Sequence, residues 1–159
     1  MIQLCVRRES ELYNPFDPTH TRLNDDVYAY LKKFFTEAEQ EKKVRDTLQI
    51  YSDGQIDMDK LKQSIHNAVE DEKYAYDSQI RKNHKRALQG YIVGGLLSVL
   101  GFALSIYFNQ IILEIISFIG SISVREAVMI QTKINPDIRS LKKRLDPICE
   151  LKLVKAGES

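Results

Sequence analysis

The feature that most constrains this chain is a long stretch without charge. No Asp, Glu, Lys or Arg occurs between Arg86 and Glu114, although charged residues make up 28% of the sequence. Residues 87–108 give a run of 22 mostly apolar residues, about 33 Å long as an α-helix. The hydrocarbon core of a bilayer is about 30 Å thick, whereas buried core helices usually contain only about 10–14 apolar residues. The run therefore predicts a membrane-spanning helix.

A second apolar segment follows and is shorter. Residues 111–124 would form a helix of about 21 Å. A full crossing must extend to Ile130 and then includes Glu114, Arg125 and Glu126. These residues lie near the ends of the segment, so each costs less than the roughly 2.5–3.5 kcal/mol of a charge at a helix centre. We therefore expect a tight transmembrane hairpin whose second helix is shallow or tilted.

Basic residues around the hairpin predict its orientation. They cluster before the first segment and again within residues 139–144, whereas the connection at residues 109–110 has none. Under the positive-inside rule, both ends of the hairpin then face the cytoplasm. The expected location is an inner or plasma membrane with both termini cytoplasmic. The basic residues that precede the hairpin are Arg81, Lys82, Lys85 and Arg86.

The two chain ends together predict a small cytosolic domain. Residues 2–7, 47–51 and 148–154 alternate apolar and polar side chains, as half-buried strands do. An amphipathic helix over residues 25–43, capped by Asn24, is expected to cover one face of the sheet. The order of the strands is left open. Because the first and last strands belong to one sheet, the middle of the chain is an insertion that leaves the domain and returns.

The expected fold is thus an α+β membrane protein. A transmembrane two-helix hairpin is inserted in a small cytosolic α/β domain of about three strands plus amphipathic helices. No Gly or Pro interrupts residues 58–89, so a helix capped by Asp57 should run unbroken into the membrane. Asn135, followed by Pro136, is expected to cap a short helix after the hairpin. The segments are residues 1–57 and 131–159 for the cytosolic domain, 58–86 for the leading helix and 87–130 for the hairpin.

Small residues recur along one face of the first predicted span. In lipid, such faces let helix backbones approach closely, because packing rather than hydrophobicity drives helix association there. The small residues serve either the contact between the two spans or self-association with a second copy of the chain. They are Gly90, Gly94, Ser98, Gly101 and Ser105 in the first span, and Ser117, Gly120 and Ser121 in the second.

Glu114 is an acidic residue inside the apolar region, and two interpretations of it remain open. Ionisable groups within a membrane often belong to pores or proton paths. The alternative is that Glu114 lies at the outer turn of the hairpin, near the lipid headgroups.

Motifs for catalysis or cofactor binding are absent from the sequence. It contains no GxxxxGK[ST], GxGxxG, HExxH, CxxC or GxSxG pattern. His66 and His84 would lie about 27 Å apart on one helix and cannot bind the same metal. Cys5 and Cys149, each in a predicted strand, are expected to be free thiols, and Asp17 with His20 to form a turn. We therefore expect no enzymatic activity, no cofactor and no metal.

The resulting functional hypothesis is a small, non-enzymatic integral membrane protein. Its cytosolic domain would bind or sense a protein or small ligand and be coupled to a membrane-embedded, oligomeric hairpin. Such a hairpin would act as a pore or effector, or as a scaffold subunit of a larger complex. The net charge of +1 indicates no nucleic-acid partner. The alternative is a soluble regulator or enzyme whose hairpin is a buried core or a dimer interface.

Overall fold

The computed structural model describes two compact units. The chain is described over residues 2–19, 21–40, 47–52, 54–104 and 110–156. Unit 1 comprises Met1–Tyr74 and Leu141–Ser159, and unit 2 comprises Ala75–Ser140. Both ends of the chain therefore contribute to the same unit, and helix α2 (Met58–Leu104) contributes residues to each unit.

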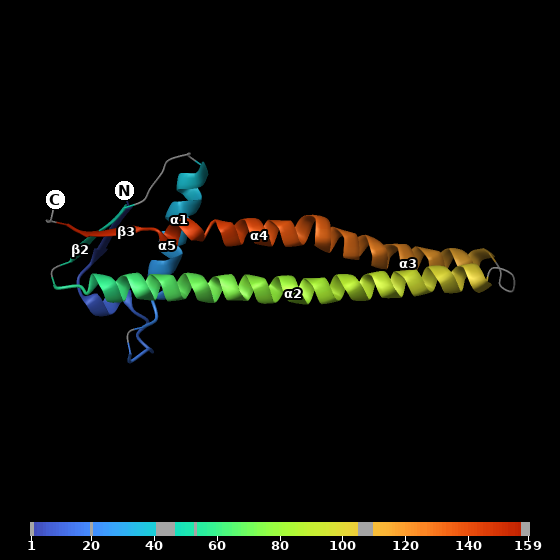
Figure 1. Cartoon of the computed structure of the whole chain (residues 1–159), viewed down its shortest axis with the longest axis horizontal. Coiled ribbons are helices and arrows are strands. Elements are labelled where there is room, and N and C mark those ends of the chain that lie inside the picture. Colours follow the sequence, from blue (N-terminus) through green and yellow to red (C-terminus); the bar gives the residue numbers. More distant parts are fainter. Residues whose placement is uncertain (1, 20, 41–46, 53, 105–109, 157–159) are drawn as a thin grey trace. The chain divides into compact units, whose positions relative to one another are not determined.

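Unit 1 contains a parallel three-stranded sheet in the order β1-β2-β3 (Figure 1). Leu48 in the central strand is paired with Ile2 on one side and with Leu153 on the other. Ile2, Leu48 and Ile50 are fully buried, as expected for the apolar positions of alternating strands. The prediction of a small sheet made from both chain ends is confirmed. The strands are β1 (Ile2–Val6), β2 (Thr47–Ser52) and β3 (Lys152–Lys155).

Two helices begin at the caps that the sequence predicts. Helix α1 (Asp25–Gln40) follows Asn24, whose Oδ1 accepts the amide hydrogen of Asp26 at 3.0 Å. Helix α2 follows Asp57, whose Oδ1 accepts the amide hydrogens of the second and third helical residues at 3.1 and 3.0 Å. A side-chain acceptor at this position satisfies amides that have no partner within the helix. Residues 41–43, also predicted in the first helix, lie outside the described residues.

Apolar side chains from both helices complete the core of unit 1. Leu61, Ile65 and Val69 recur every four residues and form the buried face of the first part of α2. Leu31 of α1 is also fully buried. A short 3-10 helix, η1 (Glu9–Leu12), follows β1 and buries Leu12.

The C-terminal strand is shorter than predicted. Residues 146–149 form the short helix α5 (Asp146–Cys149), and the strand begins only at Lys152. Pro147 lies in the first turn of α5, where its fixed φ suits a helix and its missing amide hydrogen costs nothing. The prediction that Cys149 lies in a strand is therefore wrong. Both Cys5 and Cys149 are free thiols.

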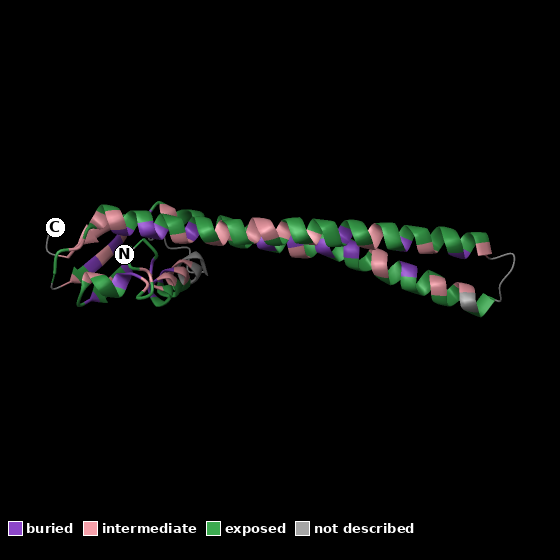
Figure 2. Cartoon of the chain, turned by 90° about the horizontal axis from the view of Figure 1, so that it is seen from below, coloured by how far each residue is buried: buried purple, intermediate pink, exposed green. Residues whose placement is uncertain are grey.

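Unit 2 pairs the second part of α2 with a helical segment made of three consecutive elements. In Figures 1 and 2 this segment runs alongside α2. Ala87 of α2 packs with Ala127 and Ile130, and Tyr91 and Ile134 pack against this buried cluster. The three elements are α3 (Gln110–Met129), the π-helix η2 (Ile130–Ile134) and α4 (Asn135–Lys143).

The prediction that Asn135 caps a separate helix is wrong. Its backbone is helical, with φ −66° and ψ −40°, and its amide donates to the carbonyl of Ile130, five residues earlier. This wider turn directly precedes Pro136, which has no amide hydrogen to donate. The buried Asn135 side chain instead accepts a hydrogen bond from Asn83 Nδ2 of α2 at 3.0 Å. Such a polar pair between two helices fixes their register.

The sequence predicts two membrane helices, but the structure supports only one of them among the described residues. Among the described residues, α2 alone is long and apolar enough to cross a membrane. Helix α3 has 20 residues, and every window of 18 residues within it contains Glu114, Arg125 and Glu126. The structure therefore supports one candidate membrane helix, with α3 packed against it.

Candidate functional site

The uncharged part of α2 leaves most of its apolar side chains on the surface. Only 17% of its most apolar 18-residue window is buried, and exposed residues dominate this part of the chain in Figure 2. Large exposed apolar patches mark sites that bind another surface. The exposed residues include Leu88, Ile92, Val93, Leu96, Val99, Leu100 and Phe102 of α2, and Ile111, Ile115, Phe118, Ile119 and Ile122 of α3.

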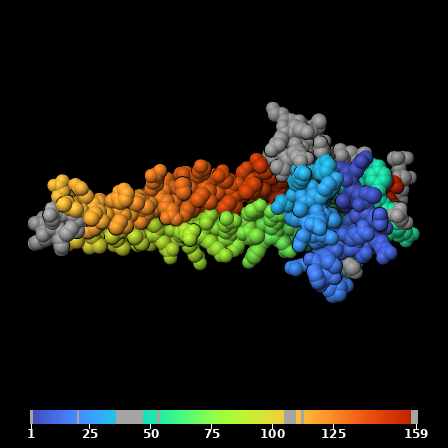
Figure 3. All heavy atoms as spheres, turned by 180° about the vertical axis from the view of Figure 1, so that it is seen from behind, coloured from blue at the N-terminus to red at the C-terminus, as the bar shows by residue number. Residues whose placement is uncertain are grey.

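The glycines of the small-residue stripe lie where α2 and α3 touch. A Cβ atom added to Gly94 would clash with Val124 Cγ2 and would lie 2.8 Å from the carbonyl oxygen of Gly120. A Cβ on Gly90 would lie 2.8 Å from the carbonyl oxygen of Ser123. No side chain fits at such distances, so glycine is what allows the two backbones to approach. Figure 3 shows atoms of the two helices in contact with each other.

The other small residues of the stripe take different places. Gly101 faces Ser117, since a Cβ on Gly101 would lie 3.7 Å from the Ser117 Oγ. Ser98 is exposed, and its Oγ donates to the carbonyl oxygen of Gly94, one turn earlier in α2. Ser121 is exposed and donates to a carbonyl oxygen of its own helix. Ser105 lies outside the described residues.

A groove of about 380 Å³ is lined by residues of both α2 and α3. Arg86 and Gly90 line it from α2, and Glu126 lines it from α3. Arg125 is exposed, as are the predicted flanking residues Arg81, Lys82 and Lys85. This arrangement places charged groups beside the exposed apolar surface.

Glu114 lies one turn into α3 and is exposed. Its Oε1 accepts a hydrogen bond from Gln110 Nε2 at 3.3 Å. A carboxylate near a helix N-terminus interacts favourably with the helix dipole. This local role needs no pore.

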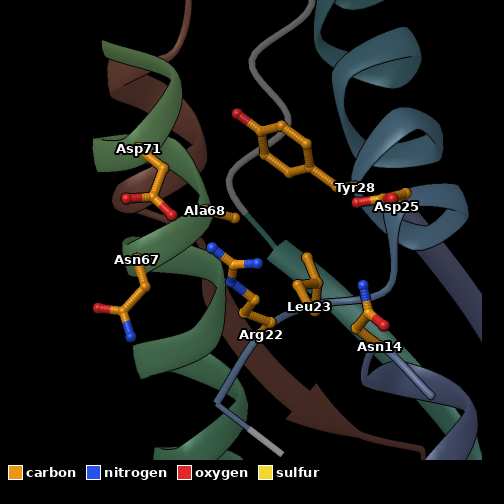
Figure 4. A pocket seen from close by; sticks show the side chains of 8 residues that line it. All are labelled: Asn14, Arg22, Leu23, Asp25, Tyr28, Asn67, Ala68 and Asp71. Atoms are coloured by element: carbon orange, nitrogen blue, oxygen red, sulfur yellow. The ribbon is translucent and has the colours of Figure 1, made fainter. Parts of the chain in front are cut away.

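Unit 1 contains a polar pocket of about 280 Å³ (Figure 4). Asn67 and Asp71 line it from α2, Asp25 and Tyr28 from α1, and Arg22 from the preceding loop. Typical pockets for drug-sized ligands are about 300–1,000 Å³, so this one suits a smaller polar molecule. Sequence reasoning missed it because three separate segments of the chain supply its side chains.

A shared carboxylate joins the two helices beside this pocket. Glu72 of α2 accepts a hydrogen bond from the Tyr28 hydroxyl at 2.6 Å and forms a 2.7 Å ion pair with Lys32. Both partners belong to α1. These two interactions therefore connect α1 to α2, the two helices that line the pocket.

The loop that supplies Arg22 is organised by Asp17. Its Oδ1 accepts hydrogen bonds from the amide and hydroxyl of Thr19, and its Oδ2 accepts the amide hydrogens of Thr21 and Arg22 at 2.9 and 2.8 Å. The Thr19 hydroxyl, followed by the Arg22 amide, holds the pKa of the Asp17 carboxyl well below its usual range. The turn predicted at Asp17 is present, and His20 lies outside the described residues.

We expect Asp17→Ala to loosen this loop, because three backbone amides lose their acceptor. Hydrogen exchange of the Thr21 and Arg22 amides should accelerate by about tenfold. The amides of β2 serve as the control, and their exchange rates should not change. In the wild type, the low folded pKa means that the carboxylate stabilises the loop above its unfolded pKa of about 4. That contribution should be lost only as the pH falls through the lower folded value. Unchanged exchange in Asp17→Ala would show that Asp17 does not hold the loop.

Three metal-ligand side chains also meet in unit 1. The ligand atoms of His66, Glu70 and Cys149 all lie within 4.8 Å of one another. Next to them, Lys73 forms ion pairs with Glu70 at 3.1 Å and with Asp146 at 3.0 Å. Burial raises the pKa of the Cys149 thiol, and the positive charge of Lys73 opposes this effect. The strand predicted for Cys149 would not bring it to His66 and Glu70, so the sequence does not reveal this group.

Comparison with known proteins assigns no relative to the chain. No protein-family description, curated protein or solved structure matches it.

Proposed function

We propose that this chain is a small, non-enzymatic integral membrane protein whose hairpin anchors unit 1 at the cytoplasmic face of a membrane. The observation that carries the proposal is the exposed, uncharged apolar surface of α2 over residues 87–104. Transfer of apolar surface out of water contributes roughly 25 cal/mol per Å². A bilayer provides that transfer along the whole segment, and the basic residues before it suit the cytoplasmic headgroups.

In this proposal α3 enters the membrane together with α2. Its backbone lies close to α2 at Gly90 and Gly94, so the two helices would insert as one packed hairpin. Arg125 and Glu126 lie at one end of α3 and Glu114 near the other. A tilted or shallow α3 would keep these three charges near the headgroups.

Self-association would use the face of α2 that α3 does not cover. A Cβ on Gly95 would meet nothing within 4 Å. Leu88, Ile92 and Val99 are 60%, 52% and 67% exposed. An oligomer built through this face would leave the contact between α2 and α3 intact. It would give a pore-like effector or a scaffold subunit.

Coupling to the cytosolic side would run through α2 itself. Asn67, Ala68 and Asp71 of this helix line the polar pocket of unit 1, and residues 87–104 form the apolar segment. A small ligand or protein that displaces the first part of α2 would therefore act on the helix that enters the membrane.

The soluble alternative must cover the same surface with a second copy of the chain, because the chain itself leaves it exposed. High-speed centrifugation of a cell lysate distinguishes the two proposals. We expect the chain in the membrane pellet after an alkaline wash, with release only by detergent. Recovery in the cytosolic supernatant as a dimer would support the alternative and overturn the membrane proposal.

The substitution Glu114→Gln distinguishes the pore version of the proposal from the scaffold version. We expect the variant to insert and to fold as the wild type does, because it removes a charge near a helix end and retains the size of the side chain. If the carboxylate belongs to a conduction path, ion flux through vesicles containing the protein should change. If the hairpin is a scaffold, flux should be at background for both proteins. Loss of insertion in Glu114→Gln would contradict both versions.

A further inference from the structure

We propose that His66, Glu70 and Cys149 form a zinc-binding site in unit 1. His66 and Glu70 are four residues apart on α2 and therefore project from the same face of the helix. Cys149 is the last residue of α5. The site would join the middle of the chain to its C-terminal segment within one unit.

The separation of the ligand atoms fits a metal ion after a small adjustment. They all lie within 4.8 Å of one another, whereas ligands around tetrahedral zinc lie about 3.3–3.8 Å apart given bond lengths near 2.0–2.3 Å. A closure of about 1–1.5 Å is therefore enough. His66 and Glu70 are exposed, so rotation of their side chains achieves it without moving the backbone.

The chemistry of the ligands selects zinc over hard cations. One imidazole nitrogen, one thiolate sulfur and one carboxylate oxygen form a donor set that zinc accepts and that magnesium and calcium do not favour. A fourth position would remain for water or an additional ligand.

Charged groups of both signs surround the thiol. Lys73 exerts the largest electrostatic effect on Cys149, and the carboxylates of Glu70, Asp146 and Glu150 act in the opposite direction. Lys73 occupies Glu70 Oε1, and the other carboxylate oxygen can still coordinate a metal. By binding both Glu70 and Asp146, Lys73 also links α2 to α5 next to the proposed site.

Cobalt(II) titration of the full chain in detergent tests this site, since Co²⁺ replaces zinc in such sites and its bond to a thiolate gives a near-ultraviolet charge-transfer band. We expect one Co²⁺ per chain, displaced by Zn²⁺. Cys149→Ser should remove the band, whereas Cys5→Ser, the matched control at the other cysteine, should retain it. His66→Gln should weaken binding by at least about tenfold. This exposed position cannot affect the core, so the variant keeps the test valid if Cys149→Ser is poorly folded.

Three results would overturn the proposal. The first is a wild-type chain that gives no thiolate band at millimolar Co²⁺. The second is a band that persists in Cys149→Ser, and the third is binding that is unchanged in His66→Gln. A rise in the melting temperature of the wild type with Zn²⁺, absent in His66→Gln, would support it independently.

Discussion

Gly94→Ala is expected to disrupt the packing of α2 on α3, whereas Gly95→Ala, at the adjacent position, is expected to be tolerated. Either change improves helix propensity by about 1 kcal/mol. At Gly94 the new methyl group meets Val124 and a backbone carbonyl oxygen 2.8 Å away. Overpacking of this kind costs typically about 1–3 kcal/mol, and a backbone oxygen cannot move aside as a flexible side chain does.

Thermal or SDS-induced unfolding in detergent micelles, followed by circular dichroism, measures this difference. Gly94→Ala should unfold more readily than the wild type, and Gly94→Leu should have no stable hairpin. Gly95→Ala should be as stable as the wild type or slightly more stable, because nothing lies within 4 Å of its Cβ position. Equal stability of the two alanine variants would show that the backbones of α2 and α3 do not approach at Gly94.

Leu96→Arg is expected to reduce membrane insertion strongly. Leu96 is 59% exposed and lies near the middle of the uncharged segment. An arginine at the centre of a membrane helix costs roughly 2.5–3.5 kcal/mol, which lowers the equilibrium constant for insertion by about 100-fold. An insertion assay with a modification site placed beyond the span measures the inserted fraction, from which this constant follows.

The matched control is Gln79→Arg, an exposed position in the same helix before the apolar segment. This variant should insert normally. In water, both substitutions would be surface changes worth within about 0.5 kcal/mol. Normal membrane association of Leu96→Arg, or a soluble and folded variant with unchanged stability, would therefore contradict a membrane location for this surface.

Local sequence signals predicted much of unit 1. The alternation in residues 2–7 and 47–51 reflects burial of one face of each strand, and Asn24 and Asp57 cap the helices that follow them. These features depend on neighbouring residues alone. The parallel order of the strands depends on how the ends of the chain return to each other, and no local pattern contains it.

Two predictions were wrong because the sequence pattern behind each of them is compatible with more than one local structure. Asn135 and Pro136 are typical of a helix start, but the chain is already helical there and accommodates Pro136 with a π turn. The alternation around Cys149 resembles a strand, yet Pro147 begins a helical turn. This second error hid the cluster of metal-ligand residues, because Cys149 meets His66 only once α5 is placed beside α2.

Accessibility of cysteines across the membrane tests the central claim most directly. In a background of Cys5→Ser and Cys149→Ser, Gln110→Cys places a thiol at the start of α3. A second protein retains Cys5 alone, an exposed thiol in unit 1. The account predicts that a membrane-impermeant maleimide labels the Gln110→Cys protein in intact cells and labels Cys5 only after permeabilisation. Labelling of Cys5 in intact cells, or labelling of both proteins only after lysis, would contradict it.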